Sequence, residues 1–304
     1  MFKLHPKKVS EKVKGWFAVP VPYEVNNPKA DWSPYFVTYE NQKWGQWDSD
    51  DCWCLSGINN LQAQLNLLKP QFSSEATNFF TTNGYLDVNG NFCLSERFIE
   101  ILSGVADNGN SQMAVWTLIQ KYGCIPRTAL TYTLAQAQAD ANETLFEKDY
   151  YNPAYITPAM EQLGLQFLEY VSVDTQWIGD GKTTPPLQVL RAALAQAPLQ
   201  IGIPVNVSQW NNSYVPYDGS KVVKHAINML STNPTGYVCY DQYQPDIKTL
   251  APDYYIPLLT QGVATVIKPV ESNPVPQNPV NNSVWQQVLA YLRSIKIVVG
   301  GIFS

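Results

Sequence analysis

The chain has 304 residues, of which 45% are hydrophobic, and a formal net charge of −5. This length is enough to bury one substantial core made of two subdomains. The mildly acidic balance indicates no nucleic-acid partner, because the one basic run, Lys3 to Lys14, is a short terminal stretch. Of the five cysteines only Cys52 and Cys54 are closely spaced, and no second pair or usable histidine nearby completes a zinc site. We therefore predict no metal and no cofactor.

Residues 1–30 are predicted to form an N-terminal extension. Met1 to Lys14 contains no apolar run long enough for the hydrophobic region of a signal peptide. The expectation is that the protein works in the cytoplasm, where it is made, and that its cysteines stay reduced.

A helix is predicted to begin at or near Cys52. Apolar residues recur at three- and four-residue spacing from Leu55 until Pro70 stops the run; they are Leu55, Ile58, Leu61, Leu65 and Leu68. The free N–H groups and partial positive charge of a helix N-terminus favour a thiolate and can donate to an oxyanion. Cys52 is thus a candidate nucleophile. The alternative, that it is one more small buried residue, stays open at this point.

His225 is the one credible imidazole base, since the only other histidine, His5, lies in the basic terminal stretch. It sits in an apolar, β-branched segment, residues 222–230, which predicts a strand. A second predicted strand, residues 236–243, contains Asp241, which can orient an imidazole. A cysteine early in the chain, a histidine late and a polar residue shortly after it suit a thiol–imidazole enzyme.

These segments, in this order, resemble a papain-like cysteine peptidase over roughly residues 31–268. The motifs that carry the resemblance are Asp31-Trp32, Cys52-Trp53-x-Leu55-Ser56, Leu94-Ser95-Glu96, Asp107-Asn108-Gly109-Asn110, the helix from Val115 to Gly123, and Lys224-His225-Ala226. The resemblance implies an α+β fold of two subdomains. A helical left subdomain would hold Cys52, and a β-barrel-like right subdomain would hold His225 and Asp241.

The resemblance also assigns roles. Cys52 would be the nucleophile and His225 the acid–base group, with Asp241 where the family has asparagine. A carboxylate there can still fix the imidazole and would favour a thiolate–imidazolium pair. For the oxyanion-hole amide, Gln42 fits the family's local motif, whereas Gln46 has the family's six-residue spacing before the cysteine; we favour Gln42 and keep Gln46 as the alternative.

Further positions follow from the same resemblance. Gly109 and Asn110 would pair with the substrate backbone, and Met113 would lie beside a selectivity pocket. Ser49 and Asp107 stand where the family has the two cysteines of its first disulfide, so that bridge cannot form here.

In place of the family's tryptophan after the orienting residue, this chain has Gln242-Tyr243. Trp177 cannot take that role, so the shielding of the triad from water is assigned to Tyr243.

The predicted function is that of a cysteine peptidase, which hydrolyses peptide bonds of a peptide or protein substrate through an acyl-enzyme thioester. Thirty leading residues are too few for a folded inhibitory prosegment. This short leader, the missing disulfide and Asp241 look more like papain-like proteins of bacteriophages and bacteria, which would place the protein in the host cytoplasm or the virion. Two alternatives are a non-catalytic virion or assembly component and a related acyl-transfer enzyme, either a transglutaminase or a cell-wall amidase.

Beyond residue 268 the composition changes. Residues 269–283 are rich in proline and asparagine and predict an extended linker. Residues 284–304 predict an amphipathic helix with an apolar end, too short and too polar to span a bilayer. That helix has three possible uses: docking on the catalytic domain, binding a partner or a second copy, and contact with a membrane surface.

Overall fold

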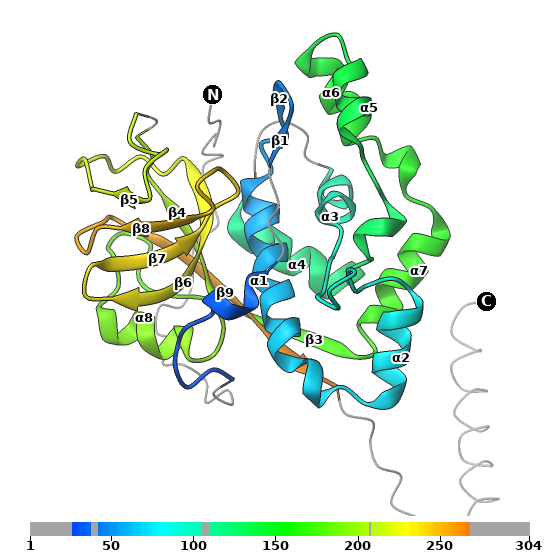
Figure 1. The fold of residues 1–304 in the computed structure, drawn as a ribbon, viewed down its shortest axis with the longest axis horizontal. Helices are drawn as coiled ribbons and strands as arrows, with labels where there is room; N and C mark the ends of the chain where they lie inside the picture. Colours follow the sequence, from blue (N-terminus) through cyan, green and yellow to red (C-terminus); the bar gives the residue numbers. More distant parts are fainter. Residues whose placement is uncertain (1–25, 38–41, 105–109, 207, 268–304) are drawn as a thin grey trace, which may run out of the picture. The chain divides into compact units, whose positions relative to one another are not determined.

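The computed structural model describes residues 26–37, 42–104, 110–206 and 208–267. The predicted linker and C-terminal helix, residues 269–304, lie outside the described residues, and so do residues 1–25. The described part combines a group of helices with one large β-sheet, and helix α1 lies between them (Figure 1). None of the described helices is long and apolar enough to cross a membrane.

Helix α1, Cys52–Leu68, is the predicted cysteine helix. It ends one residue before the short 3-10 turn Lys69–Gln71, which contains Pro70, as the sequence indicates. Nearly all of its residues are buried, because other elements pack on both sides of it. These are helices α3 (Glu96–Ser103) and α4 (Gln112–Tyr122), and strands β6 (His225–Asn233) and β9 (Leu258–Val266). The helix is therefore the structural centre of the molecule and not a surface element.

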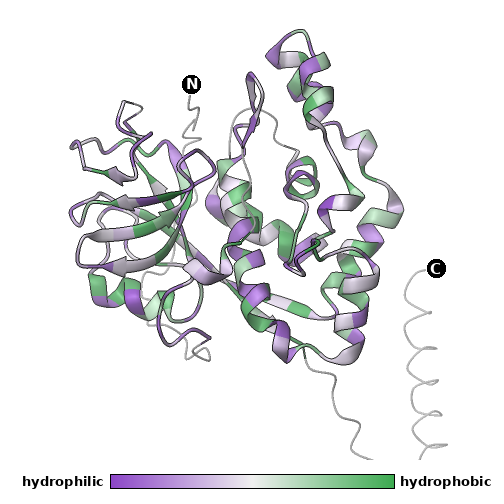
Figure 2. Cartoon of the chain, viewed as in Figure 1, coloured by the Kyte–Doolittle hydropathy of each residue, from purple (hydrophilic) through white to green (hydrophobic). Residues whose placement is uncertain are grey.

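Hydrophilic as well as hydrophobic residues occur along α1 (Figure 2). Because the helix is buried, its polar side chains form hydrogen bonds with other parts of the protein instead of with water. Asn60 donates to the carbonyl of Pro198 at 2.9 Å, and Gln64 donates to the carbonyl of Gly262 at 2.8 Å. Gln200 in the sheet returns a bond of 2.6 Å to the carbonyl of Trp53. A buried amide is tolerated only when it is paired, so these bonds fix α1 against the sheet in one position.

The helical half consists of α2 (Ser74–Thr82), α3 (Glu96–Ser103), α4 (Gln112–Tyr122) and α7 (Pro158–Phe167) around an aromatic core. Each helix begins at a serine or threonine whose side chain accepts a bond from a first-turn N–H. Gly123 follows α4 at φ 69°, where a Cβ would meet the carbonyl oxygen of Gly164 at 1.7 Å, so only glycine fits.

The sheet has seven strands in the order β3-β9-β4-β6-β7-β8-β5. Their bounds are β3 (Val171–Trp177), β4 (Leu199–Ile203), β5 (Tyr214–Val215), β6 (His225–Asn233), β7 (Gly236–Tyr240), β8 (Ile247–Leu250) and β9 (Leu258–Val266). All neighbours are antiparallel except β5 and β8. Helix α8 (Leu187–Leu194) packs on the sheet through buried Leu190 and Leu194.

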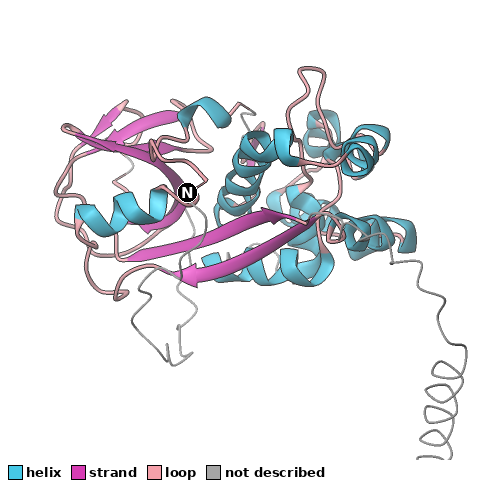
Figure 3. Ribbon diagram, turned by 90° about the horizontal axis from the view of Figure 1, so that it is seen from below, coloured by secondary structure: helices cyan, strands magenta, loops and turns pink. Residues whose placement is uncertain are grey.

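The barrel-like form expected for this half needs correction, since the described sheet is open. Its edge strands, β3 and β5, do not pair with one another, and β5 has only two residues. The long pair β3 and β9 instead reaches away from the sheet to the helices (Figure 3), where Val173 and Ala264 join the helical core. The two halves thus share a pair of strands as well as α1.

A small aromatic cluster supports the hairpin that precedes the cysteine helix. Strands β1 (Lys43–Trp44) and β2 (Trp47–Asp48) form this hairpin, which packs against helices α5 (Leu134–Ala139) and α6 (Glu143–Tyr150) through Trp44, Trp47, Tyr132, Phe146 and Tyr150. Trp47 donates to the carbonyl of Ala137 at 3.0 Å. The remaining turns are Ser33–Tyr35, Arg127–Ala129 and Pro153–Tyr155.

Candidate active site

Cys52 is the first residue of α1, and a tight turn presents it. Asp50, two residues earlier, has φ 52°, a conformation that non-glycine residues rarely adopt. Asp51 is the N-cap residue, and its carbonyl accepts bonds from the N–H groups of Cys54 and Leu55 at 2.8 and 3.0 Å. Backbone strain of this kind, of about 1–3 kcal/mol, persists only where the surrounding structure holds it.

The thiol of Cys52 meets the second half of the molecule directly. Helix α1, which begins at Cys52, packs against strand β6, which begins at His225, and the backbone of Ala226 next to His225 lowers the pKa of Cys52. Burial has the larger and opposite effect, and the carboxylates of Asp51, Asp50 and Asp48 add to it, so that the pKa of Cys52 is raised overall. The thiolate expected from the helix N-terminus alone is therefore opposed by burial and by three acidic neighbours.

His225 and Asp241 form a buried pair. His225 is the first residue of β6, and its Nε2 lies 2.7 Å from Oδ1 of Asp241, which directly follows β7. Both side chains are almost fully shielded from solvent. Since β6 and β7 are adjacent antiparallel strands, the hairpin between them returns the acid to the histidine. The carboxylate therefore engages the imidazole through Nε2.

Asp241 has two more partners, on its second oxygen. Oδ2 accepts from Nε1 of Trp210 at 2.7 Å and from Nζ of Lys248 at 3.0 Å. Burial alone would raise the pKa of Asp241, but the charges of His225 and Lys248 together hold it below its usual range. The acid is therefore held as a carboxylate.

Two aromatic rings border the imidazole. The ring of Tyr243 lies 5.3 Å from that of His225, in the position assigned to shielding. The ring of Trp210 meets the imidazole edge-on at 5.7 Å, and the sequence motifs did not identify it. Trp177 ends strand β3 and has no contact of this kind with the imidazole in the described structure.

The two glutamine candidates lie in different environments. Gln42 is buried, and its Oε1 meets no donor among the described residues. Its carbonyl accepts from both N and Oγ of Ser49, at 3.1 and 3.0 Å, and the hydroxyl of Tyr151 donates to the carbonyl of Ser49. Gln46 is exposed at the turn between β1 and β2. Only Gln42 therefore has the enclosed setting that an oxyanion-hole amide needs.

The predicted substrate-backbone residues are only partly described. Gly109 lies outside the described residues, while the Oδ1 of half-buried Asn110 accepts from the N–H of Ser111 at 2.8 Å. Met113 is half-buried on the first turn of α4 and packs on the helical core. Beside it, Gln112 has a buried amide without a partner among the described residues. Its Oε1 packs close to Gly202: a Cβ added to that glycine would lie 3.2 Å from it.

Asp51, which directly precedes Cys52, forms a pair of buried acids with Glu100. Both are buried and their side chains contact each other, and burial raises the pKa of Asp51 to about 7 and that of Glu100 well above its usual range. Neither oxygen of Glu100 meets a donor elsewhere in the described chain. Two ionised carboxylates only accept hydrogen bonds, so the pair is stable when it holds a proton.

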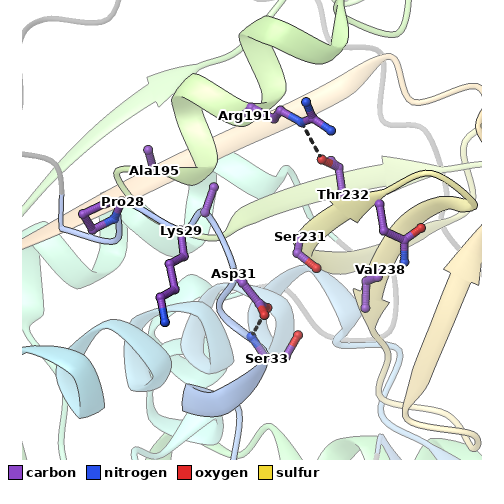
Figure 4. Close-up of a pocket in the computed structure, with 11 residues that line it drawn as sticks. Pro28, Lys29, Asp31, Ser33, Arg191, Ala195, Ser231, Thr232 and Val238 are labelled. Atoms are coloured by element: carbon purple, nitrogen blue, oxygen red, sulfur yellow. Dashed lines mark hydrogen bonds between the residues drawn. The ribbon is translucent and has the colours of Figure 1, made fainter.

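A pocket of about 680 Å³ lies apart from these residues (Figure 4). It is bordered by the segment from Pro28 to Ser33, by Arg191 of α8 and by Ser231 and Thr232 of β6, and Nε of Arg191 donates to Oγ1 of Thr232 at 3.1 Å. Cys52, His225 and Asp241 do not line it. Within the described ranges no group of three or more His, Cys, Asp or Glu side chains could hold a metal ion.

Neither a protein-family model nor a curated protein matches the sequence. Solved structures do match the fold. The digestive procathepsin L 3 of Tenebrio molitor larval midgut matches with a TM-score of 0.51 and 14% identity, over 77% of this chain and 68% of that chain.

Two further matches are weaker. The Amb a 11 cysteine protease of ragweed pollen, in its proform, matches with a TM-score of 0.47 and 13% identity over 79% of this chain, and the match spans 64% of the proform. The bromelain protease of Ananas comosus matches with a TM-score of 0.46 and 9% identity, over 77% of this chain and 97% of that chain. Identities this low bear on the fold alone, and the similarity to procathepsin supports it. The chain therefore has a papain-like α+β fold, built from a helical half and an open seven-stranded sheet.

Proposed function

We propose that this protein is a cysteine peptidase whose nucleophile is Cys52, whose acid–base group is His225 and whose orienting acid is Asp241. The observation that carries the proposal is the contact between the two halves at this point. Helix α1, which begins at Cys52, packs against strand β6, which begins at His225, and the imidazole of His225 is fixed by Asp241 at 2.7 Å. A nucleophile, a base and an orienting group in series are the minimum for acyl transfer through a thioester.

The raised pKa of Cys52 defines the first step. Because burial and the acidic neighbours of Cys52 oppose its ionisation, the first step needs a base: the proton passes from Sγ to His225, which gives the thiolate–imidazolium pair. Sγ then bonds to the peptide carbonyl carbon. The oxyanion is held by the backbone N–H of Cys52 and the amide of Gln42, a contribution of about 2.7–4 kcal/mol. His225 returns the proton to the leaving amine, and water activated by His225 cleaves the thioester.

Selective labelling with iodoacetamide tests the nucleophile without a known substrate. Cys93 is the one half-buried cysteine, whereas Cys52, Cys54, Cys124 and Cys239 are buried. Exposure alone therefore predicts that Cys93 reacts first. An activated Cys52 should react faster than Cys93, and a His225→Ala variant should lose that advantage while Cys93 labelling stays the same.

Cleavage of a peptide library then tests the reaction. Wild-type protein should cut peptides, and Cys52→Ala and His225→Ala should not, although both should unfold at the wild-type denaturant midpoint. Selective labelling without cleavage, but with activity on cross-linked or cell-wall peptides, would favour a transglutaminase or an amidase. Labelling at Cys93 alone would contradict the proposal and favour a non-catalytic binding protein.

Two finer statements are part of this proposal and rest on the sequence alone. The substrate is a peptide or protein, and the site of action is a reducing compartment such as the cytoplasm of the producing cell, which suits five free thiols. Bacteriophage or bacterial character stays a prediction from the motifs.

A further inference from the structure

We propose that Lys248 is a positioning residue of the active site, a buried counter-ion that lets Asp241 orient His225 without imposing a full negative charge on it. This inference rests on the proposed function, since it concerns the same histidine. Lys248 lies on β8, seven residues after Asp241, and touches neither Cys52 nor His225 in any described hydrogen bond.

The ammonium group of Lys248 is fully buried and fully paired. Nζ contacts Oδ2 of Asp241 at 3.0 Å and donates to the carbonyls of Tyr243 and Pro245 at 2.7 and 2.6 Å. An ammonium has three N–H donors, so all three are used. Nζ also lies 5.3 Å from the centre of the Trp210 ring, which adds a cation–π contact.

These contacts place Lys248 behind the acid and not beside the thiol. Oδ1 of Asp241 faces His225, while Oδ2 faces Lys248 and Trp210. The two carbonyl bonds also hold the turn that follows Asp241, whose N–H donates to the carbonyl of Asp246 at 2.7 Å. The lysine therefore fixes both the charge and the orientation of the carboxylate.

A lysine is a costly choice for this place. Residues 248 and 250 face the same side of β8, and Leu250 shows that an apolar side chain packs there. Removing a lysine charge from water costs several kcal/mol, and an apolar pair of similar volume is often at least as stable as a buried ion pair. Packing alone therefore does not explain Lys248, whereas a need to balance the charge of Asp241 does.

The balance changes what the histidine experiences. A lone carboxylate would stabilise the imidazolium strongly, while a carboxylate paired with an ammonium resembles a neutral amide. The other titratable groups around Asp241 are the buried thiol of Cys239 on β7, whose pKa burial raises, and the phenol of Tyr243, whose pKa burial also raises. Neither is charged near neutral pH, so neither offsets Asp241, whereas Lys248 does so from the side opposite His225.

The test is the pH dependence of Cys52 labelling by iodoacetamide in wild type, Lys248→Met, Asp241→Asn and the double variant. Lys248→Met leaves the carboxylate uncompensated, so the pH range of fast labelling should extend upward by about one unit or more. Asp241→Asn leaves the ammonium of Lys248 without its carboxylate, so the upper pH limit of fast Cys52 labelling should fall. The double variant carries a neutral orienting group without a counter-ion and should return toward the wild-type profile.

Exposed Lys224, next to His225 in sequence, supplies the matched control. Solvent screens its charge, so Lys224→Met should shift the profile far less than Lys248→Met. Single variants that shift the profile in the same direction, or a Lys224→Met shift as large as that of Lys248→Met, would overturn the proposal.

Urea unfolding of the same four proteins separates this inference from the proposed function. Each single variant leaves a buried charge unpaired and should be less stable than the double variant, or fail to fold where the double variant folds. That coupling is expected even if Cys52 proves unreactive in wild type, in which case only the peptidase assignment fails. A double variant no more stable than the worse single variant would refute the pairing itself.

Discussion

The hydroxyl of Tyr243 donates to Oδ2 of Asp48 at 2.7 Å and so joins the loop after β7 to the hairpin in front of the nucleophile. The ring of Tyr243 also borders His225. Burial raises the pKa of Tyr243 most, the nearby charge of Asp48 raises it further, and a negative charge on Cys52 would add to both. One residue thus borders the imidazole of His225 and links the loop after β7 to the hairpin that precedes Cys52.

Tyr243→Phe should break this link. The ring remains, but the bond to Asp48 is lost, at a cost of about 1 kcal/mol for a hydrogen bond to a partly exposed carboxylate. Iodoacetamide should then reach Cys52 faster than in wild type. A matched control is Tyr155→Phe, since Tyr155 makes a similar bond to Asp149 on an exposed surface. Equal labelling rates in all three proteins would show that Tyr243 does not restrict access.

The proton shared by Asp51 and Glu100 makes stability depend on pH. The folded pKa of Asp51, about 7, lies above its ordinary value of 3.8, so the folded protein binds a proton that the unfolded chain releases. The contribution to stability is complete below about pH 4 and is lost progressively as the pH rises through 7, so the protein should be less stable at pH 7.5 than at pH 5. Urea unfolding at pH 5 and pH 7.5 measures the loss.

Glu100→Gln should flatten that dependence. The amide of glutamine donates to Asp51 without a titrating proton, so the midpoints at pH 5 and pH 7.5 should move closer together than in wild type. Glu161→Gln, on an exposed position of α7, serves as the control and should keep the wild-type difference. An unchanged pH difference in Glu100→Gln would mean that the two acids do not share a proton.

Trp210→Phe should weaken the hold on Asp241 while the aromatic packing on His225 remains. The lost N–H bond to a carboxylate is worth about 1.5–3 kcal/mol, so kcat/KM on a cleavable peptide should fall tenfold or more. The pH dependence of peptide cleavage should shift as well, because the carboxylate of Asp241, next to the imidazole, loses a hydrogen-bond donor. Trp32→Phe loses a buried indole bond to the carbonyl of Leu194 and should lower stability without a shift in the profile.

Gln42→Ala and Gln46→Ala decide which amide serves the oxyanion. Loss of an oxyanion donor lowers kcat by about 100-fold to 1,000-fold and leaves KM nearly unchanged. We expect this of Gln42→Ala and not of Gln46→Ala, because Gln46 is exposed in the hairpin turn. The opposite result would assign the role to Gln46 and would require the hairpin to fold over the site.

Local signals in the sequence were sufficient for the elements that carry the site. The three- and four-residue spacing after Leu55 and the proline at position 70 fixed both ends of α1, and the apolar segment at His225 indicated β6. These features work because they act over one or two turns or along one strand. The structure places His225 beside Asp241, while the catalytic roles that the order cysteine, histidine, aspartate suggests for them stay a prediction.

The partners that come from distant parts of the chain were not predictable in this way. Trp210 reaches Asp241 from a loop, and Glu100 reaches Asp51 from α3, with no spacing rule to connect either pair. One signal was present. Lys248 lies two residues before Leu250 on one strand, so the two side chains share a face and the lysine charge points inward. The open sheet was not predictable either, because pairing between edge strands far apart in the chain leaves no local motif; here β3 and β5 do not pair.

The segment before the nucleophile is held entirely by non-covalent bonds. Ser49, at a position where the related pattern has a disulfide cysteine, bonds instead to the carbonyl of Gln42, and Tyr151 bonds to the carbonyl of Ser49. All five cysteines are free thiols, so a reductant finds no covalent cross-link to break. If Cys52 is the nucleophile, as proposed above, an oxidant that reached its Sγ would stop the reaction without breaking any bond that holds this segment.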